Sequence, residues 1–173
     1  MHNSGEEKNI ISSDKGKVTI SGGTFSSTST YGVISNWGSG TFKSALSGIY
    51  LCDSSKVVIK GGTFKHAKVS SVKAVSTTFL YNDGGTLTIS GGTFTNSKAD
   101  SALLINLGKA TISGSASLKD SGKTRDTVIN EGGTLTIKGG TITKTGAKNV
   151  PLSVSGGTVK MTGGTIKATN EMA

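Results

Sequence analysis

Residues 84–94 read GGTLTISGGTF and residues 132–142 read GGTLTIKGGTI, so the chain repeats almost the same eleven residues 48 positions apart. Between the glycine pairs, apolar and polar residues alternate, which is the period-two pattern of a β-strand. Glycine readily adopts the positive φ that sharp corners need. Each unit therefore predicts a corner, a short strand, a second corner and another strand, which is a structural repeat and carries no chemistry of its own.

The repeat continues beyond these two units with a step of 24 residues. Asn82 marks one fixed position of the repeat, which we call the marker position, and the step of 24 leads from it to Asn106 and Asn130. Apolar columns keep the same step through four repeats: Leu80, Leu104, Val128 and Leu152; and Phe94, Leu118, Ile142 and Ile166. We therefore expect stacked coils with the apolar columns inside and the marker amides bonded in a ladder.

Each coil is interpreted as three short strands. A marker strand ends at the marker, and a first and a second GGT strand follow the two glycine pairs. Before the regular repeats, Ser13, Asn36 and Asp53 take the marker position, with steps of 23, 17 and 29 residues. The short step lacks its first GGT strand, and the long step holds an insertion around residues 69–75, so about seven turns are counted.

These patterns predict an all-β fold, a right-handed parallel β-helix of about seven coils with three short strands each. The right hand is expected because parallel crossovers are right-handed in about 98% of cases. One domain should span residues 9–173, after a disordered or non-native start at residues 1–8. The last coil has no capping helix, which indicates a fragment of a longer surface protein or end-to-end self-association.

Composition narrows the classes of partner. The 173 residues include 19 Lys and Arg against 10 Asp and Glu, a net charge of +9, which attracts polyanions. Arg125 is the only arginine. Because base-reading sites usually depend on the bidentate guanidinium, sequence-specific nucleic-acid binding is not expected. Membrane insertion is not expected either, since no stretch approaches the roughly 20 apolar residues of a membrane helix.

The strand alternation separates outward residues from inward ones. Threonine and lysine dominate the outward positions of both GGT strands, and threonine is common on exposed strands. On the second GGT strand the outward columns are Thr24, Thr63, Thr93, Ser117, Thr141 and Thr165, and Ser26, Lys65, Thr95, Lys119, Thr143 and Lys167. On the first they are Lys17, Lys56, Thr86, Lys109, Thr134 and Thr158, and Thr19, Val58, Thr88, Thr111, Thr136 and Lys160.

With these repeats in view, the chain resembles the right-handed parallel β-helix proteins, the superfamily of pectate lyases, polygalacturonases, phage tailspikes and many bacterial surface adhesins. Its GGTLTISGGTF and GGTVKMTGGTI units are most similar to the glycine-threonine repeats of large secreted or wall-attached proteins of Gram-positive bacteria. The resemblance runs from about Asn9 to Thr169. It implies a secreted or cell-surface location, whereas the superfamily's functions include catalysis, binding and plain stalks.

The acidic residues do not support catalysis. Pectate lyases, as the resemblance implies, cluster acidic Ca²⁺ ligands beside a basic residue, and that ion takes six to eight oxygens. Glycoside hydrolysis needs two carboxylates on one face. Here the aspartates are scattered, at Asp14, Asp53, Asp83, Asp100, Asp120 and Asp126, and the sequence places no evident acidic or serine partner in register with His66. We expect no catalytic residue, no metal and no cofactor.

The marker strand differs from the GGT strands because its outward positions, three and one before the marker, are apolar in the middle turns. A solvated face should not be apolar. The insertion at residues 69–75 could cover it, a partner chain or neighbouring domain could pack on it, or it could bind a ligand. In the last case the candidate contacts are Trp37, Tyr50, Phe79, Tyr81, Leu103 and Ile105.

A second candidate surface is electrostatic. The acid-free stretch from Ser54 to Asn82 is rich in lysine. It could hold an acidic glycan, or it could be a solvated basic edge. Its candidate contacts are Lys56, Lys60, Lys65, Lys68 and Lys73.

The sequence as a whole predicts a non-catalytic module of a secreted or cell-surface bacterial protein. Its expected role is adhesion, by binding a glycan, for which an acidic glycan is one candidate, or a host protein such as mucin or immunoglobulin. Side-by-side or end-to-end self-association is a further expectation. The alternatives are a polysaccharide-active enzyme of the pectate-lyase type and a purely structural stalk.

Overall fold

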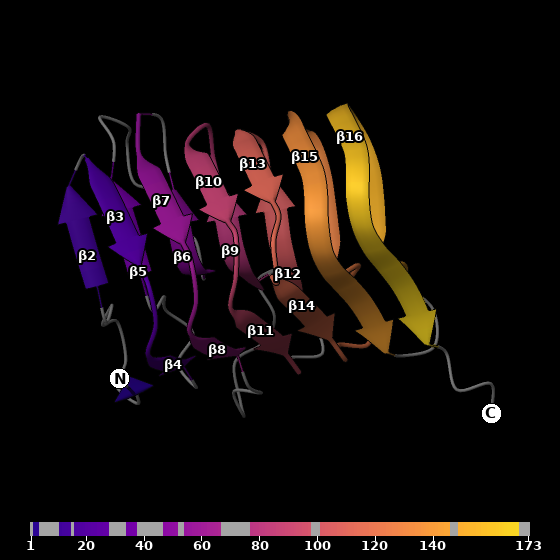
Figure 1. Ribbon diagram of the computed structural model, residues 1–173, viewed down its shortest axis with the longest axis horizontal. Helices are drawn as coiled ribbons and strands as arrows, with labels where there is room; N and C mark the ends of the chain where they lie inside the picture. Colours follow the sequence, from indigo (N-terminus) through magenta and orange to yellow (C-terminus); the bar gives the residue numbers. More distant parts are fainter. Residues whose placement is uncertain are drawn as a thin grey trace.

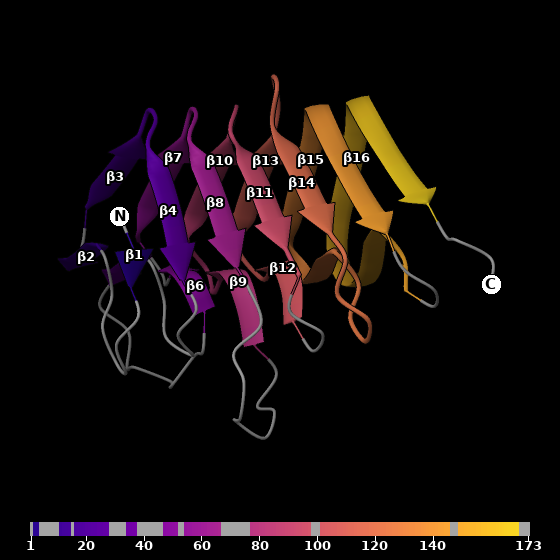
Figure 2. The same ribbon diagram turned by 90° about the horizontal axis from the view of Figure 1, so that it is seen from below.

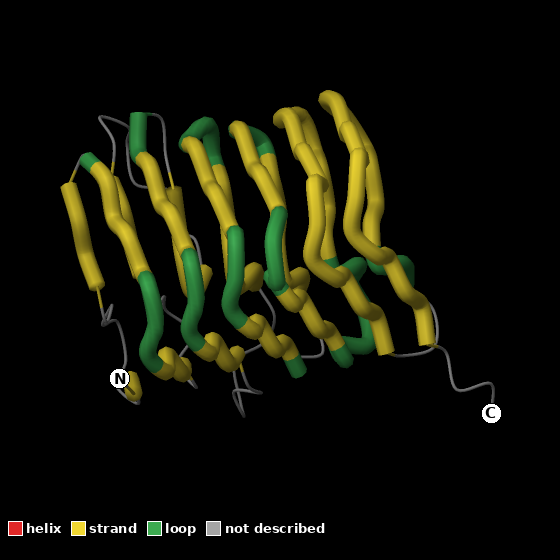
Figure 3. Tube along the Cα trace, in the orientation of Figure 1, coloured by secondary structure: helices red, strands yellow, loops and turns green. Residues whose placement is uncertain are grey.

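The computed structural model describes residues 2–3, 11–14, 16–27, 34–37, 47–51, 54–66, 77–97, 101–145 and 149–169, and none of these is helical (Figure 3). The strands are β1 (His2–Asn3), β2 (Ile11–Asp14), β3 (Lys17–Ile20), β4 (Thr24–Ser27), β5 (Ile34–Trp37), β6 (Ser47–Leu51), β7 (Lys56–Ile59), β8 (Thr63–His66), β9 (Thr77–Asn82), β10 (Thr86–Ile89), β11 (Thr93–Asn96), β12 (Ser101–Asn106), β13 (Lys109–Ile112), β14 (Ser117–Asp120), β15 (Val128–Thr145) and β16 (Leu152–Thr169).

All strand pairs are parallel, and the chain winds as a β-solenoid whose strands stack along the long axis (Figure 1). The marker ladder contains β2, β5, β6, β9 and β12. The first GGT ladder contains β3, β7, β10 and β13, and the second contains β4, β8, β11 and β14, which face the reader in Figure 2. The bent strands β15 and β16 each pass through all three ladders. The predicted parallel β-solenoid is confirmed.

About four turns are described in full, rather than the seven predicted. They are β9–β11, β12–β14, β15 and β16. The shorter strands from β2 to β8 extend the same ladders toward the N-terminus. In addition β1 pairs with β4.

The core is a set of apolar columns that run through the coils in the predicted register. Phe25, Phe64 and Phe94 stack as nearly parallel rings, with centroids 4.9 and 4.5 Å apart. Leu118 and Ile142 continue their column and are also buried. Because no single coil can enclose its own apolar residues, this column couples neighbouring coils.

The marker amides form the predicted ladder inside the solenoid. Asn82 Nδ2 donates to Asn106 Oδ1 at 2.7 Å, and Asn106 Nδ2 donates to Asn130 Oδ1 at 2.8 Å. Asn130 Nδ2 continues to the carbonyl oxygen of Gly156 at 2.7 Å. All three asparagines are fully buried. Apart from Asn82 Oδ1, which accepts no hydrogen bond from the described residues, these bonds satisfy amide groups that would otherwise be costly to bury.

The prediction of Asp53 as a marker is wrong. The residue beside Asn82 in the preceding coil is Leu51, and Leu51 in turn lies beside Asn36. The register is set by the apolar residues, since Ile49 pairs with Leu80, and a slip would move apolar side chains to the wrong face.

By contrast, all four outward columns predicted for the GGT strands have the predicted partners.

The outward orientation predicted for Phe79 and Leu103 is also wrong. Both are fully buried in the main core. Leu103 and Leu104 both donate their backbone N–H to the carbonyl oxygen of Thr127, at 2.9 and 3.0 Å, so two residues of β12 oppose one of the next coil. This is a β-bulge, which breaks the alternation and places both leucines in the core.

The glycine corners yield a matched test of coil packing. A Cβ on Gly133 would overlap the carbonyl oxygen of Gly108 in the preceding coil, whereas a Cβ on Gly132 meets nothing within 4 Å. We expect Gly133→Ala to lower the free energy of unfolding by about 1–3 kcal/mol, the usual range for overpacking. Gly132→Ala should change it by less than about 0.5 kcal/mol. Urea unfolding of the two variants compares them, and equal losses would contradict this account of the corners.

Candidate functional site

The charged side chains that the two GGT ladders turn outward are all lysines, within the described residues. Every one is exposed, and no aspartate or glutamate lies among them. They are Lys17, Lys56, Lys109 and Lys160 on the first ladder, Lys65, Lys119 and Lys167 on the second, and Lys60 and Lys138 at the corner between them. The solenoid therefore has two adjacent basic faces.

The described acidic side chains lie elsewhere. Asp83 and Glu131 directly follow the marker asparagines of their coils, and Asp126 lies in the connection before β15. Asp120 belongs to the second GGT ladder but is 1% exposed and points inward. This separation of charge strengthens the positive potential over the GGT ladders.

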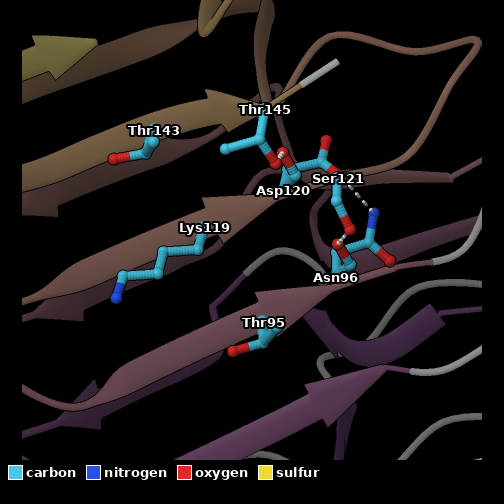
Figure 4. Close-up of a pocket in the computed structure, with 7 residues that line it drawn as sticks. All are labelled: Thr95, Asn96, Lys119, Asp120, Ser121, Thr143 and Thr145. Carbon is cyan, nitrogen blue, oxygen red and sulfur yellow. Dashed lines mark hydrogen bonds between the residues drawn. The ribbon is translucent and has the colours of Figure 1, made fainter. Parts of the chain in front are cut away.

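Lysine and threonine alternate along one outward column of the second GGT ladder. From coil to coil, Lys65 pairs with Thr95, Thr95 with Lys119, Lys119 with Thr143 and Thr143 with Lys167. Figure 4 shows Thr95, Lys119 and Thr143 on successive strands. A shallow pocket of about 230 Å³ is lined by these three residues and by others at the strand ends, among them Ser121 and Thr145.

A column of polar residues runs through the interior behind this face. It contains His66, Asn96, Asp120 and Lys144, which are at most 4% exposed and pair in register from β8 to β15. Asp120 Oδ1 accepts from Asn96 Nδ2 at 3.0 Å, and Asp120 Oδ2 accepts from Lys144 Nζ at 2.9 Å. Lys144 Nζ also donates to the carbonyl oxygen of Arg125 at 2.6 Å.

The sequence analysis missed this column, although a signal for it was present. Alternation from the inward Phe94 places Asn96 inward, and the same parity places Asp120 and Lys144 inward after Leu118 and Ile142. Their polar character concealed the pattern, because charged residues are rarely buried unless they are paired. The expectation that His66 has no serine partner is wrong, because Ser101 Oγ lies 3.4 Å from His66 Nδ1. The His66 ring also stacks on Phe79, with centroids 5.2 Å apart, so this histidine has a structural role.

Burial dominates the two shifted pKa values. Desolvation raises the pKa of Asp120, against the opposing effects of Lys144, the Gly122 N–H and Asn96. Desolvation also raises the pKa of Tyr81, and the negative charges of Asp83 and Glu131 act in the same direction.

The predicted aromatic and apolar contacts are only partly brought together. Tyr50 and Tyr81 are neighbours in the marker ladder, and Ile105 follows Tyr81, while Trp37 lies outside this column. For Trp37 and Tyr50 the structure describes the backbone and not the side chain. Ile105 is 5% exposed and packs with Ala102 and Ile129, and the half-buried Tyr81 packs against them. Phe79 and Leu103, being fully buried, present no surface to a ligand.

Of the five lysines predicted to contact a ligand, the structure describes three. Lys56, Lys60 and Lys65 are exposed on or between the GGT ladders. Lys68, Lys73 and the insertion at residues 69–75 lie outside the described residues. In the part of the chain that is described, no three His, Cys, Asp or Glu side chains are grouped so that they could hold a metal ion.

The fold and its surface define a parallel β-solenoid with two basic outer faces. The chain matches no family model, and no match is found for it among curated proteins or solved structures. Across the described residues, no helix has the length and apolar character needed to span a membrane.

Proposed function

We propose that this chain is a non-catalytic adhesion module of a secreted or cell-surface bacterial protein, which binds an acidic glycan through its two basic faces. The observation that carries the proposal is the charge of the two GGT ladders, where the described strands turn only lysine outward among charged residues. Such a face attracts a polyanion over its whole length. The threonine and serine hydroxyls between the lysines can donate to and accept from sugar hydroxyls.

A glycan is favoured over other polyanions by the kind of cation present. Each exposed lysine is a point charge on a flexible stem, suited to a carboxylate or sulfate in varied geometry. Arg125, the single arginine, lies outside the GGT strands. Sequence-specific nucleic-acid recognition usually relies on bidentate arginine contacts, which these faces do not offer.

The proposal predicts binding that depends on charge. We expect the quadruple variant Lys65→Gln, Lys109→Gln, Lys119→Gln and Lys160→Gln to bind acidic glycans roughly 30-fold more weakly, taking about 0.5 kcal/mol for each exposed ion pair. The matched Lys→Arg quadruple variant should retain binding, and added salt should weaken the wild type. A glycan array that includes mucin and immunoglobulin measures all three proteins. Binding that is equal for the Gln and Arg variants would rule out the basic faces as the site.

The alternative functions give different results in the same experiment. A pectate-lyase-type enzyme would cleave polygalacturonate when Ca²⁺ is present, whereas the module proposed here binds without turnover. A structural stalk would bind nothing on the array. Binding to mucin that survives removal of its acidic sugars would indicate recognition of a host protein instead.

Self-association is a second proposal, and it rests on the last described coil. Val154 and Met161 in β16 are 53% and 45% exposed, although their columns are buried in the preceding coil. An exposed apolar edge of this kind favours the stacking of another coil. Sedimentation velocity over a range of concentrations tests it, and a single monomeric species throughout would exclude it.

A further inference from the structure

The second GGT ladder carries a regular arrangement of charge that the first ladder lacks. Across five consecutive coils one of its outward columns contains Lys65, Thr95, Lys119, Thr143 and Lys167. Each of these residues pairs with the next one in the neighbouring coil. All three lysines are exposed, and both threonines are partly exposed. The column of the first ladder that holds most of its lysines starts with two lysines in adjacent described coils and ends with two threonines, so its charges are not evenly spaced.

The spacing of these lysines follows from the fold. Neighbouring parallel strands lie about 4.8 Å apart, so lysines on every second coil recur at roughly 10 Å along the solenoid axis. An extended sugar chain advances by about one strand spacing for each ring. Where successive rings face opposite ways, substituents on every second ring point to the same side. One ring per coil therefore brings every second ring opposite a lysine.

We propose that this column, from Lys65 to Lys167, binds a linear glycan that carries one carboxylate or sulfate on every second sugar and lies along the solenoid axis. This inference rests on the proposed function and adds the ligand's charge period and its direction. The charged rings pair with Lys65, Lys119 and Lys167. The neutral rings lie over Thr95 and Thr143, whose hydroxyls hydrogen-bond with sugar hydroxyls.

The surface beside the column is hollowed. The shallow pocket lies at Thr95, Lys119 and Thr143, at the centre of the five coils, and includes Ser121 and Thr145. In Figure 4 the Lys119 side chain extends between those of Thr95 and Thr143. The adjacent outward column adds a hydroxyl in each coil, with Thr93, Ser117 and Thr141 at the same level as the pocket.

A variant that moves one charge without changing the total tests the period. In Thr95→Lys/Lys119→Thr, lysines stand at adjacent coils and only two of them fit an alternating ligand. We expect up to about fivefold weaker binding of a hyaluronan octasaccharide, which has one carboxylate for every two sugars, because one exposed ion pair is lost. Binding of poly-glutamate, a flexible polymer with dense charge, should not change.

The matched control makes the same exchange on the other basic face. Thr86→Lys/Lys109→Thr uses the same two coils, since Thr86 pairs with Lys109 as Thr95 pairs with Lys119. Because it keeps the total charge of a face whose lysines are not evenly spaced, it should weaken octasaccharide binding less than Thr95→Lys/Lys119→Thr does. Circular dichroism checks that the two variants fold alike.

The outcomes separate this inference from the proposed function. If the octasaccharide binds Thr95→Lys/Lys119→Thr as tightly as it binds the wild type, or if the control loses as much, the period has no role and this inference fails. The proposed function then still stands, because the acidic glycan binds. If the wild type binds no acidic glycan, the proposed function fails as well.

Discussion

Replacing Asp120 with alanine should lower the free energy of unfolding by about 3–5 kcal/mol, the usual cost of removing one partner of a buried ion pair. Lys144 would remain fully buried without the carboxylate that its Nζ contacts at 2.9 Å. Asn96 would lose its bond to the same carboxylate. Urea unfolding followed by circular dichroism measures the loss.

The companion variant identifies the cause. In Asp120→Leu/Lys144→Met both charges are removed, and apolar groups of similar size fill the space. Replacing a whole buried pair in this way is often neutral or stabilising. The double variant should therefore recover most of the stability that Asp120→Ala loses. A double variant as unstable as Asp120→Ala would mean that the backbone needs the carboxylate, for instance as acceptor for the Gly122 N–H at 2.8 Å.

A second large effect is expected at the centre of the aromatic stack. Phe64→Ala should lower the free energy of unfolding by about 3–5 kcal/mol, because it leaves a cavity in the core. Phe64 is fully buried and stacks on Phe25 and Phe94, so two ring contacts are lost together. The midpoint of urea unfolding should fall accordingly.

Phe64→Leu is the control for this position. The same column holds Leu118 two coils later, so the site accepts an aliphatic side chain of this size. We expect a loss below about 1.5 kcal/mol, as for swaps that nearly conserve volume. If Leu and Ala prove equally damaging, the ring contacts rather than the filled volume hold the coils together.

Much of the fold could be predicted because one repeated residue pattern sets both corners and faces. The inward column of Phe94, Leu118 and Ile142 and the outward column of Lys65, Thr95 and Lys119 were both predicted with their partners. Alternation and a constant step are sufficient for this, since stacked coils place equal positions side by side. The basic faces of the candidate site follow from the same register.

The errors arise where backbone geometry departs from strict alternation or where composition misleads. The bulge at Leu103 turns a residue inward that alternation places outside. Asp53 resembles the marker in polarity, yet the pairing of Ile49 with Leu80 selects Leu51. The Asp120–Lys144 pair was missed because its burial depends on a partner 24 residues away, and polarity by itself predicts exposure.

The start of the amide ladder at Asn82 has a mechanical consequence. In a repeat protein the free energy of unfolding is approximately the sum of each coil's own stability and the stability of each interface between neighbouring coils. At the interface between β6 and β9, Leu51 faces Asn82, and among the described residues Asn82 Oδ1 accepts no hydrogen bond. A buried unsatisfied acceptor costs about 1–3 kcal/mol. Native-state hydrogen exchange should therefore reveal a seam at this interface, with the coils from β9 onward opening as a separate cooperative block.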